Sequence, residues 1–358
     1  MLTPVAASAK RIFERLDTLY AIGGGEGANR PGFSPEERQA HDLASTWMRE
    51  VGLEVEVDAI GNLLGRLRGS RAELPEVWTG SHLDSVLRGG RFDGALGVVA
   101  GLETVERAAA SGARERTLGV VAFRAEETGC HGSRALCQTG LLPGTFLEVH
   151  VEQGPRLADA GAPLGVVTSI AGIARAELVF EGRAGHAGTT PMAGREDALA
   201  AAAAFILRVR EAAGQIDGAV ATVGRLELEA GAENVIPAHV RLTVDARAPD
   251  LERFEALVAA LELEPHYRFE PVALAETPRL VLREEIDALG LPVIELASGA
   301  GHDAGVMAAS GVDSAMLFVR SLAGGVSHSP AEDSSEEDVG LAVEVLTRTL
   351  ARLAATPR

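Results

Sequence analysis

Several features are scarce in this chain of 358 residues, and each scarcity excludes some classes of protein. It contains only two cysteines, Cys130 and Cys137, whose spacing fits neither a zinc knuckle nor a thioredoxin-type motif, so we expect two reduced thiols. No run reaches the ~18 apolar residues that a membrane helix needs, and residues 1–10 lack the basic start and apolar core of a signal peptide. These absences predict a cytoplasmic protein without a membrane span.

Positive charge is also scarce. The sequence has 33 Lys and Arg against 51 Asp and Glu, a formal net charge of −18, and Lys10 is its only lysine. This balance argues against nucleic acid and anionic membranes as partners, and it favours the binding of cations. Hydrophobic residues are plentiful at 46%, which over this length is enough for two domains with sizeable cores.

Residues 79–94, TGSHLDSVLRGGRFDG, carry one imidazole and two carboxylates between a predicted strand and a predicted helix. The strand is expected at residues 75–79, and residues 94–110 have the apolar spacing of a helix. His82 therefore follows a strand and Asp93 begins a helix. Open α/β sheets place their ligands at such positions.

The first part of the chain alternates strands and helices. Ser34, Pro35 and Glu37 match a capping box that begins a helix. Apolar runs at 117–125 and 146–151 are typical of strands buried in a parallel sheet, and polar residues gather where they end. This order indicates βαβ units and an α/β fold.

The pattern changes near Ala171 and returns later. Residues 172–276 have the order β-α-β-β-α-β, which is that of the ferredoxin-like sandwich, and α/β patterning resumes over residues 277–358. The sequence thus predicts a first domain formed by residues 1–171 and 277–358, interrupted by an inserted α+β domain at 172–276.

Nine histidines are spread over the chain, and five lie in turns rich in glycine or small residues. For any one of them, a hydrogen-bonded loop histidine is the simpler interpretation. The case for chemistry therefore rests on the group as a whole. Its members are His82, His150, His186, His302 and His328.

A two-metal hydrolytic site needs nitrogen and oxygen ligands, a bridging carboxylate and a further carboxylate that takes a proton from water. Glu126 matches the further carboxylate, and Asp84 can accept the second imidazole N–H of His82. Without the histidines, the pair Glu126 and Glu127 would be read as a solvated loop and Asp84 as a turn cap. Residues of ligand type at expected strand ends, or in the loops beyond, are His82, Asp93, Glu127, His150 and His328.

Six segments together resemble the hydantoinase/carbamoylase branch of the di-metal aminoacylase and carboxypeptidase superfamily. The branch includes N-carbamoyl-L-amino acid amidohydrolases, allantoate amidohydrolases and beta-ureidopropionases. The resemblance covers nearly the whole chain, and its motifs occur in the family's order. The segments are 79–94, the Glu126–Glu127 pair, HVEQGP at 150–155, GHAGTTPM at 185–192, GHDA at 301–304 and SHS at 327–329.

The resemblance implies an α/β/α catalytic domain on a mixed sheet, with an inserted domain that acts as a lid and joins two copies into a homodimer. It also implies two divalent ions per subunit, zinc, manganese, cobalt or nickel, between which ligand type does not choose. His82 and His150 would bind one ion, Glu127 and His328 would bind the other, and Asp93 would bridge them. In the family the peptide that corresponds to Asp93–Gly94 is typically cis.

Catalytic and substrate contacts follow from the same resemblance. Glu126 would be the general base and then the general acid. His186 would approach the scissile carbonyl oxygen, Asn234 would hold the substrate, and Arg247 would clamp its carboxylate with a planar bidentate fork. All three would act on the active site of the partner subunit.

Two further polar contacts to the substrate are implied, at Gln153 and His302. The simpler interpretations stay open at this stage. Asn234 is also typical of a turn, Arg247 of a charge at a strand end, and His302 of a helix-start cap.

The chain departs from the branch between the Glu-Glu pair and the HVEQGP segment. Only residues 128–149 separate the two motifs, whereas branch members carry a longer segment there. The predicted reaction is hydrolysis of the carbamoyl C–N bond of an N-carbamoyl-L-amino acid, giving the amino acid, carbon dioxide and ammonia. The alternatives are an allantoate amidohydrolase, an N-acyl amino acid deacylase or dipeptidase, and a catalytically silent paralogue used for binding.

Overall fold

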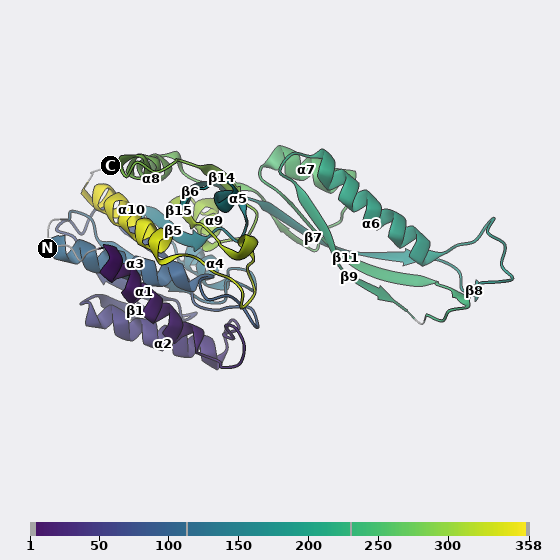
Figure 1. Ribbon diagram of the computed structural model, residues 1–358, viewed down its shortest axis with the longest axis horizontal. Coiled ribbons are helices and arrows are strands. Elements are labelled where there is room, and N and C mark those ends of the chain that lie inside the picture. Colours follow the sequence, from purple (N-terminus) through teal and green to yellow (C-terminus); the bar gives the residue numbers. More distant parts are fainter. Residues whose placement is uncertain (1–4, 112–113, 230, 356–358) are drawn as a thin grey trace. The chain divides into compact units, whose positions relative to one another are not determined.

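The computed structural model describes residues 5–111, 114–229 and 231–355. The chain divides into two compact units, each with its own core (Figure 1). The first runs to Thr168 and resumes at Ala273, and the second is Ser169–Val272. The sequence predicts an inserted domain at 172–276, a range that overlaps most of this second unit.

A nine-stranded mixed sheet forms the centre of the first unit. Its order is β1-β2-β4-β3-β5-β15-β6-β13, and β14 also pairs with β6. The four strands β4, β3, β5 and β15 run parallel, whereas β1 with β2, β2 with β4, and β6 with β15 pair antiparallel. The strands are β1 (Glu54–Val57), β2 (Leu63–Leu67), β3 (Val77–His82), β4 (Leu118–Phe123), β5 (Thr145–Val151), β6 (Leu164–Ile170), β13 (Val272–Ala273), β14 (Glu295–Ser298) and β15 (Asp313–Val319).

Helices cover both faces of this sheet, which confirms the α/β/α arrangement. Five of them share one hydrophobic core against one face, and α4 and α9 pack on the other. The five are α1 (Val5–Tyr20), α2 (Pro35–Glu50), α3 (Ala95–Ser111), α8 (Glu276–Ala288) and α10 (Glu336–Ala355). The shorter ones are α4 (His131–Thr139), α5 (Arg156–Asp159), α9 (Asp303–Ala309) and the 3-10 turn η1 (Ala323–Gly325).

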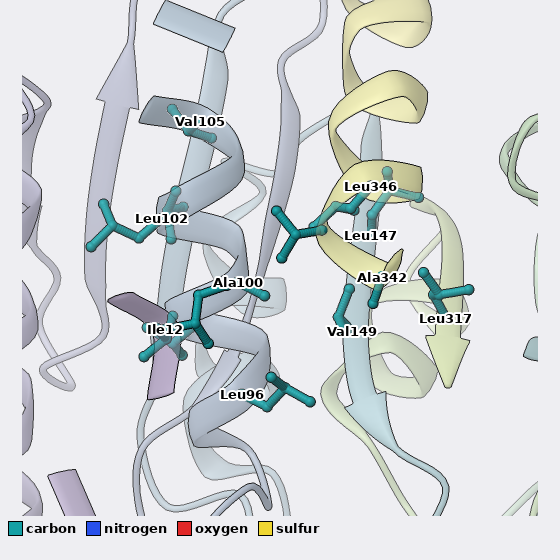
Figure 2. Packing of buried hydrophobic residues seen from close by; sticks show 14 of the residues in the cluster. Ile12, Leu96, Ala100, Leu102, Val105, Leu147, Val149, Leu317, Ala342 and Leu346 are labelled. Atoms are coloured by element: carbon teal, nitrogen blue, oxygen red, sulfur yellow. The ribbon is translucent and has the colours of Figure 1, made fainter. Parts of the chain in front are cut away.

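Successive side chains of β5 alternate between the hydrophobic core and the polar face of the sheet. Leu147 and Val149 point into the core shared with α3 and α10 (Figure 2). Because successive side chains of a strand point to opposite faces, Glu148 and His150 lie on the other face. Both are about 1% exposed. The same strand therefore supplies the core on one side and polar groups on the other.

The start of α2 follows the predicted capping box only in part. Ser34 Oγ accepts the N–H of Glu37 at 3.1 Å, and Pro35 occupies the first turn, as predicted. The Glu37 carboxylate does not return to the Ser34 N–H; it accepts the N–H of Phe33 and, at 2.8 Å, the N–H of Ala125. A residue expected to cap its own helix thus reaches the end of β4.

The second unit has the predicted ferredoxin-like order. Its four-stranded sheet runs β12-β7-β11-β9, all pairs are antiparallel, and two helices share its core. A two-stranded ribbon of β8 and β10 belongs to the same unit. The elements are β7 (Gly172–Glu181), β8 (Gly185–His186), α6 (Ala198–Gln215), β9 (Val220–Leu228), β10 (Val235–Ile236), β11 (His239–Ala248), α7 (Leu251–Ala260) and β12 (Tyr267–Phe269).

Three helices of the first unit, α4, α5 and α8, were not predicted from the sequence, and α9 was anticipated only as the helix that His302 would begin. None of them begins with a side-chain cap, so the usual signal for a helix start is missing. The helix α4 instead follows Cys130, whose backbone is left-handed with φ 54°. In the part of the chain that the structure describes, no helix combines the length and apolar character needed to cross a bilayer.

We expect the core around β15 to dominate the stability of the first unit. Leu317, 1% exposed in the core cluster, loses buried contacts in Leu317→Ala, so the free energy of unfolding should fall by about 2–5 kcal/mol. Leu141→Ala is the matched control, because this leucine is 75% exposed, and it should change that free energy by less than about 0.5 kcal/mol. Equal effects in urea denaturation of the two variants would contradict the assignment of this core.

Candidate metal centre and active site

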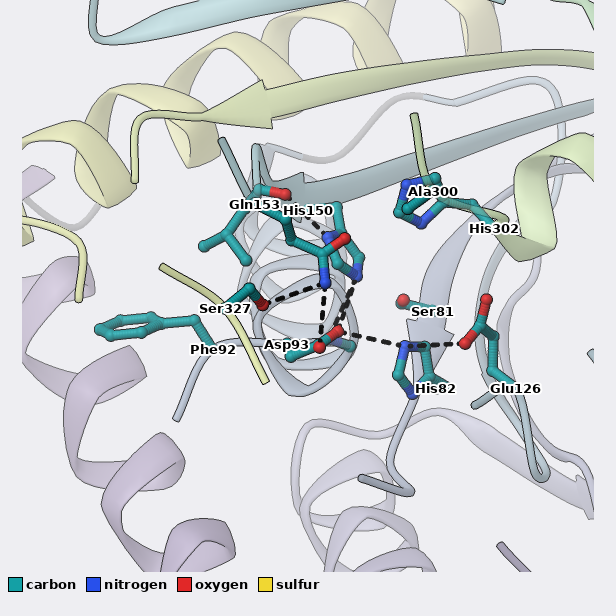
Figure 3. A network of polar contacts seen from close by, with 12 residues as sticks. Ser81, His82, Phe92, Asp93, Glu126, His150, Gln153, Ala300, His302 and Ser327 are labelled. Atoms are coloured by element: carbon teal, nitrogen blue, oxygen red, sulfur yellow. Dashed lines mark hydrogen bonds and ion pairs between the residues drawn. The ribbon is translucent and has the colours of Figure 1, made fainter. Parts of the chain in front are cut away.

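The predicted ligands of the first unit meet at the carboxyl ends of its parallel strands. His82 is the last residue of β3, His150 is the penultimate residue of β5, and Glu126 and Glu127 follow β4. Parallel strands end at one edge of the sheet, so these side chains are brought together although they are far apart in sequence. Asp93 joins them from the loop before α3 (Figure 3).

One group of ligand atoms consists of His82, Asp93 and His150. Asp93 Oδ1 lies 3.1 Å from His150 Nε2 and 3.7 Å from His82 Nε2. His150 Nδ1 lies 2.9 Å from the carbonyl oxygen of Val151, so we assign the ring proton to Nδ1. A neutral ring with its proton on Nδ1 keeps the lone pair of Nε2 available for a metal ion, as a ligand requires.

A second group consists of Asp93, Glu127 and His328. His328 Nε2 lies 3.3 Å from Asp93 Oδ2 and 3.4 Å from Glu127 Oε2. The two oxygens of Asp93 thus face different histidines, Oδ1 toward His150 and Oδ2 toward His328. A carboxylate shared in this way is suited to bridging two ions.

Asp84 does more than the predicted bond to His82. Its Oδ1 lies 3.2 Å from His82 Nδ1, and its two oxygens accept the N–H groups of Glu126 at 3.0 Å and Glu127 at 3.1 Å. Glu37 accepts the preceding N–H, that of Ala125, whose φ of 49° is left-handed. Two buried carboxylates therefore hold three consecutive backbone groups of the Glu-Glu turn. The role of Glu37 was missed from the sequence because its helix-cap position explained it locally.

Glu126 belongs to neither ligand group. Its Oε2 lies 3.7 Å from His82 Nε2 (Figure 3). The Cys130 thiol lies 3.4 Å from Glu126 Oε1. Burial raises the pKa of Glu126 well above its ordinary value, and the neighbouring charges of Asp303 and Glu127 add to the shift. A buried carboxyl group with a raised pKa, beside the ligands, is suited to moving a proton.

The electrostatics of the site favour cations. Burial, and then the charge of Asp93, raises the pKa of Glu127 to about 7. The hydrogen bond to Asp93 raises the pKa of His328 to about 9. Burial would raise the pKa of Asp93, but its bonds with His150 and His328 outweigh burial and hold that pKa well below its usual range. Protons bound to these side chains compensate part of the negative charge of the site. Divalent ions, when bound, can provide the same compensation.

Gln153 and His302 both contact ligand residues of the first unit. Gln153 Nε2 donates to Asp93 Oδ2 at 3.0 Å and to Ser327 Oγ at 3.1 Å. His302 is 3% exposed, with Nε2 at 2.9 Å from Ser298 Oγ and its ring 4.6 Å from that of His150. It stands at the start of α9 but makes no side-chain cap bond there.

The second unit holds His186, Asn234 and Arg247, and it brings two of them together. His186 lies opposite Val235 in the ribbon of β8 and β10, and the Ala187 N–H donates to the Asn234 carbonyl oxygen at 2.9 Å. Arg247 lies near the other end of this unit's sheet, where its Nε donates to Asp245 Oδ1 at 2.7 Å. His186 and Asn234 are exposed, and Arg247 is half-buried.

Two details of the Asp93 loop were not predicted correctly. The Asp93–Gly94 peptide is trans, so the cis bond implied by the family resemblance is wrong for this structure. Gly94 turns the chain instead with a left-handed φ of 63°, and an added Cβ there would lie 2.3 Å from the His82 ring. Glu332 was missed: its Oε1 accepts the N–H groups of Phe92 and Asp93. No local pattern marks these two bonds, because Phe92 and Asp93 lie more than 200 positions away from Glu332.

The chain matches a known protein family and several curated relatives. The model of peptidase family M20/M25/M40 matches residues 76–352. The chain is 38% identical to an N-carbamoyl-L-amino acid amidohydrolase of Geobacillus stearothermophilus, over 96% of this chain and 98% of the relative. It is 32% identical to an allantoate amidohydrolase of Bacillus subtilis, over 94% and 95% of the two chains.

Solved structures agree with these relatives. An amidase of the hydantoinase/carbamoylase family from Burkholderia multivorans superposes with a TM-score of 0.89 at 30% identity, over 98% of both chains. The alignment with the Geobacillus relative spans 404 positions, more than the 358 residues of this chain, so the relative carries additional segments. The chain thus belongs to peptidase family M20/M25/M40 and, within it, to the hydantoinase/carbamoylase branch.

Proposed function

We propose that this protein hydrolyses the carbamoyl C–N bond of N-carbamoyl-L-amino acids, releasing the amino acid, carbon dioxide and ammonia. One observation carries the proposal: two ligand groups share Asp93, and the Glu126 carboxyl group lies 3.7 Å from His82 Nε2 without belonging to either group. This is the set that hydrolysis of an unactivated amide requires. The identity with the Geobacillus amidohydrolase supports the substrate class.

The donor atoms fit two divalent ions. Each group offers imidazole nitrogen and carboxylate oxygen within 4.8 Å of one another, a mixed set that zinc, manganese, cobalt and nickel all accept. When bound, the ions supply the Lewis acidity that activates water and polarises a carbonyl group. His82 and His150 would hold one ion, Glu127 and His328 the other, and Asp93 both.

Glu126 has the proton-transfer role in this proposal. Its carboxylate accepts a proton from the attacking water as the oxygen bonds to the ureido carbon. The protonated carboxyl group then donates that proton to the nitrogen of the amino acid as the C–N bond breaks. Burial favours the protonated form of Glu126, which suits the second of these steps.

The inserted domain supplies the remaining contacts in this proposal. His186 would stabilise the developing oxyanion, Asn234 would hold the substrate, and Arg247 would clamp the substrate carboxylate. Gln153 and His302 would contribute from the first unit, Gln153 through its bond with Asp93. We propose a homodimer through the inserted domain, with His186, Asn234 and Arg247 acting on the partner's site. The two cysteines are free, which suits the cytoplasmic location predicted from the sequence.

Allantoate is a second candidate substrate, because the Bacillus allantoate amidohydrolase covers nearly the same length of the chain. Allantoate also presents ureido groups beside a carboxylate, so the same machinery would act on it. The two candidate activities would share one mechanism, so the relative rates of hydrolysis of the two substrates distinguish them.

A substrate panel tests the proposed reaction. We expect kcat/KM to be highest for an N-carbamoyl-L-amino acid when the panel also contains allantoate, N-carbamoyl-beta-alanine and dipeptides. Each substrate is assayed with Zn²⁺, Mn²⁺, Co²⁺ and Ni²⁺ after removal of metal by chelation, which should abolish activity. Faster turnover of allantoate would establish the second candidate, and preference for dipeptides would reject both.

Glu126→Gln should separate catalysis from metal binding. The amide cannot take a proton from water, so kcat should fall by about 10²- to 10⁴-fold while both ions stay bound. Metal content is measured by mass spectrometry on the purified variant. Glu127→Gln is the matched control one residue away, and it should weaken binding of one ion. Near-normal turnover in Glu126→Gln would remove this residue as the base.

Metal binding should depend on pH. His328, with a pKa of about 9, carries a proton at pH 7 that must leave before Nε2 binds an ion. The affinity of the Asp93, Glu127 and His328 group should therefore rise about tenfold per pH unit toward pH 9 and then level off. Calorimetry with Mn²⁺ in buffers of different ionisation enthalpy measures the released proton. His328→Gln should lower the number of protons released per bound ion by one, whereas release of the same number by the variant and the unaltered protein would contradict the assignment.

A further inference from the structure

Three side chains, those of Gln153, Ser327 and Glu332, form a closed ring of hydrogen bonds with Asp93. Glu332 Oε1 accepts the Asp93 N–H at 3.0 Å, and Glu332 Oε2 accepts the Ser327 hydroxyl at 2.6 Å. Ser327 Oγ accepts from Gln153 Nε2 at 3.1 Å, and the same amide donates to Asp93 Oδ2 at 3.0 Å (Figure 3). The backbone and the carboxylate of Asp93 are thus both held within one circuit.

The ring joins three separate segments of the first unit. Gln153 follows β5, Asp93 precedes α3, and Ser327 and Glu332 flank the loop that carries His328. Glu332 also accepts the Phe92 N–H at 2.8 Å, so its carboxylate makes three hydrogen bonds to two segments. It is 5% exposed, and hydrogen bonds to a buried charged group are stronger than neutral ones.

A glycine opposite Glu332 makes room for it. A Cβ on Gly90 would lie 2.1 Å from Glu332 Oε1, and the three nearest atoms all belong to that carboxylate. Gly90 is not among the residues with positive φ, so its backbone tolerates alanine and only the space forbids it. Gly90 and Glu332 therefore fit one another, although 242 positions separate them.

The two ligand groups differ in their dependence on this ring. His82 and His150 stand on central strands of the sheet and are both 1% exposed. His328 stands in a loop with a left-handed φ of 52°, its side chain is 51% exposed, and its contacts at the site are Asp93 and Glu127. The position of His328 relative to Asp93 thus depends on the loop that Glu332 anchors.

We propose that Glu332 is a positioning residue that aligns Asp93 with the His328 loop, so that the ion site of Asp93, Glu127 and His328 forms only while Glu332 is in place. The inference rests on the proposed two-metal function, which it extends to a residue outside the ligand set. Glu332 acts through Asp93 and Ser327 and touches neither ion nor substrate.

Metal binding tests the inference directly. Glu332→Ala should weaken binding of the second Mn²⁺ ion by roughly 10- to 100-fold and leave the first less affected, so that the purified variant retains close to one ion. Glu332→Gln keeps the shape and one acceptor oxygen, and it should lie between Glu332→Ala and the unaltered protein. Asp333→Asn is the matched control, since this neighbouring carboxylate is exposed, and it should bind both ions normally.

Gly90→Ala supplies an independent perturbation. The added methyl group should push the Glu332 carboxylate aside and reproduce the loss of the second ion without changing any polar group. In the Glu332→Ala background the obstacle is gone, so the double variant should bind metal no worse than Glu332→Ala alone. Such strong coupling between distant positions is expected only where the two side chains share one space.

Hydrogen exchange on the metal-free protein gives a readout that involves neither metal nor activity. Peptides that contain Phe92 and Asp93 should exchange at least about tenfold faster in Glu332→Ala and in Gly90→Ala, and unchanged in Asp333→Asn. A variant that merely unfolds would accelerate exchange in β3 and β5 as well, and that result would overturn the proposal.

The other outcomes are equally decisive. Glu332→Ala with two ions bound at normal affinity, equal weakening of both ions, or additive effects of Gly90→Ala and Glu332→Ala would each overturn the positioning role. Absence of carbamoylase activity in the unaltered protein, with the metal and exchange results as expected, would overturn the proposed substrate and support the role of Glu332.

Discussion

The geometry of the site depends on one buried carboxylate, that of Asp93. Its two oxygens face different histidines, Oδ1 toward His150 and Oδ2 toward His328, so a single side chain belongs to both ligand groups. A negative charge at about 4% exposure is costly unless it is compensated by cations or hydrogen bonds. The surrounding imidazoles and the Gln153 amide provide that compensation, and the same imidazoles belong to the two groups of metal-ligand type.

A second layer of carboxylates holds the first in place through the backbone. Asp84 accepts the N–H groups of Glu126 and Glu127, Glu37 accepts that of Ala125, and Glu332 accepts that of Asp93. Buried carboxylates that accept backbone N–H groups fix loops that have no strand or helix partner of their own. Several carboxylates of the site therefore position the backbone. Only some of its carboxylates belong to the groups of metal-ligand type.

Sequence patterns predicted the elements that carry their own local signals. The buried runs of β4 and β5, the capping serine of α2 and the order of the inserted domain follow from periodicity and caps, and the structure confirms them. The helices α4 and α8 were missed because neither begins with a side-chain cap. Asp84 was expected to orient His82, and its additional bonds to the Glu-Glu turn could not be predicted, since they connect residues 42 and 43 positions apart.

By itself the sequence determined the chemical inventory of this protein: which strands are buried, where polar groups follow them, and the set of imidazoles and carboxylates available for hydrolysis. Local periodicity encodes these features because each depends on near neighbours in the chain. Only the tertiary structure decided which carboxylates are ligand-like, which hold the backbone, and that Gly90 must leave space for Glu332. Those roles depend on distances between remote segments, and such distances exist only once the sheet has assembled.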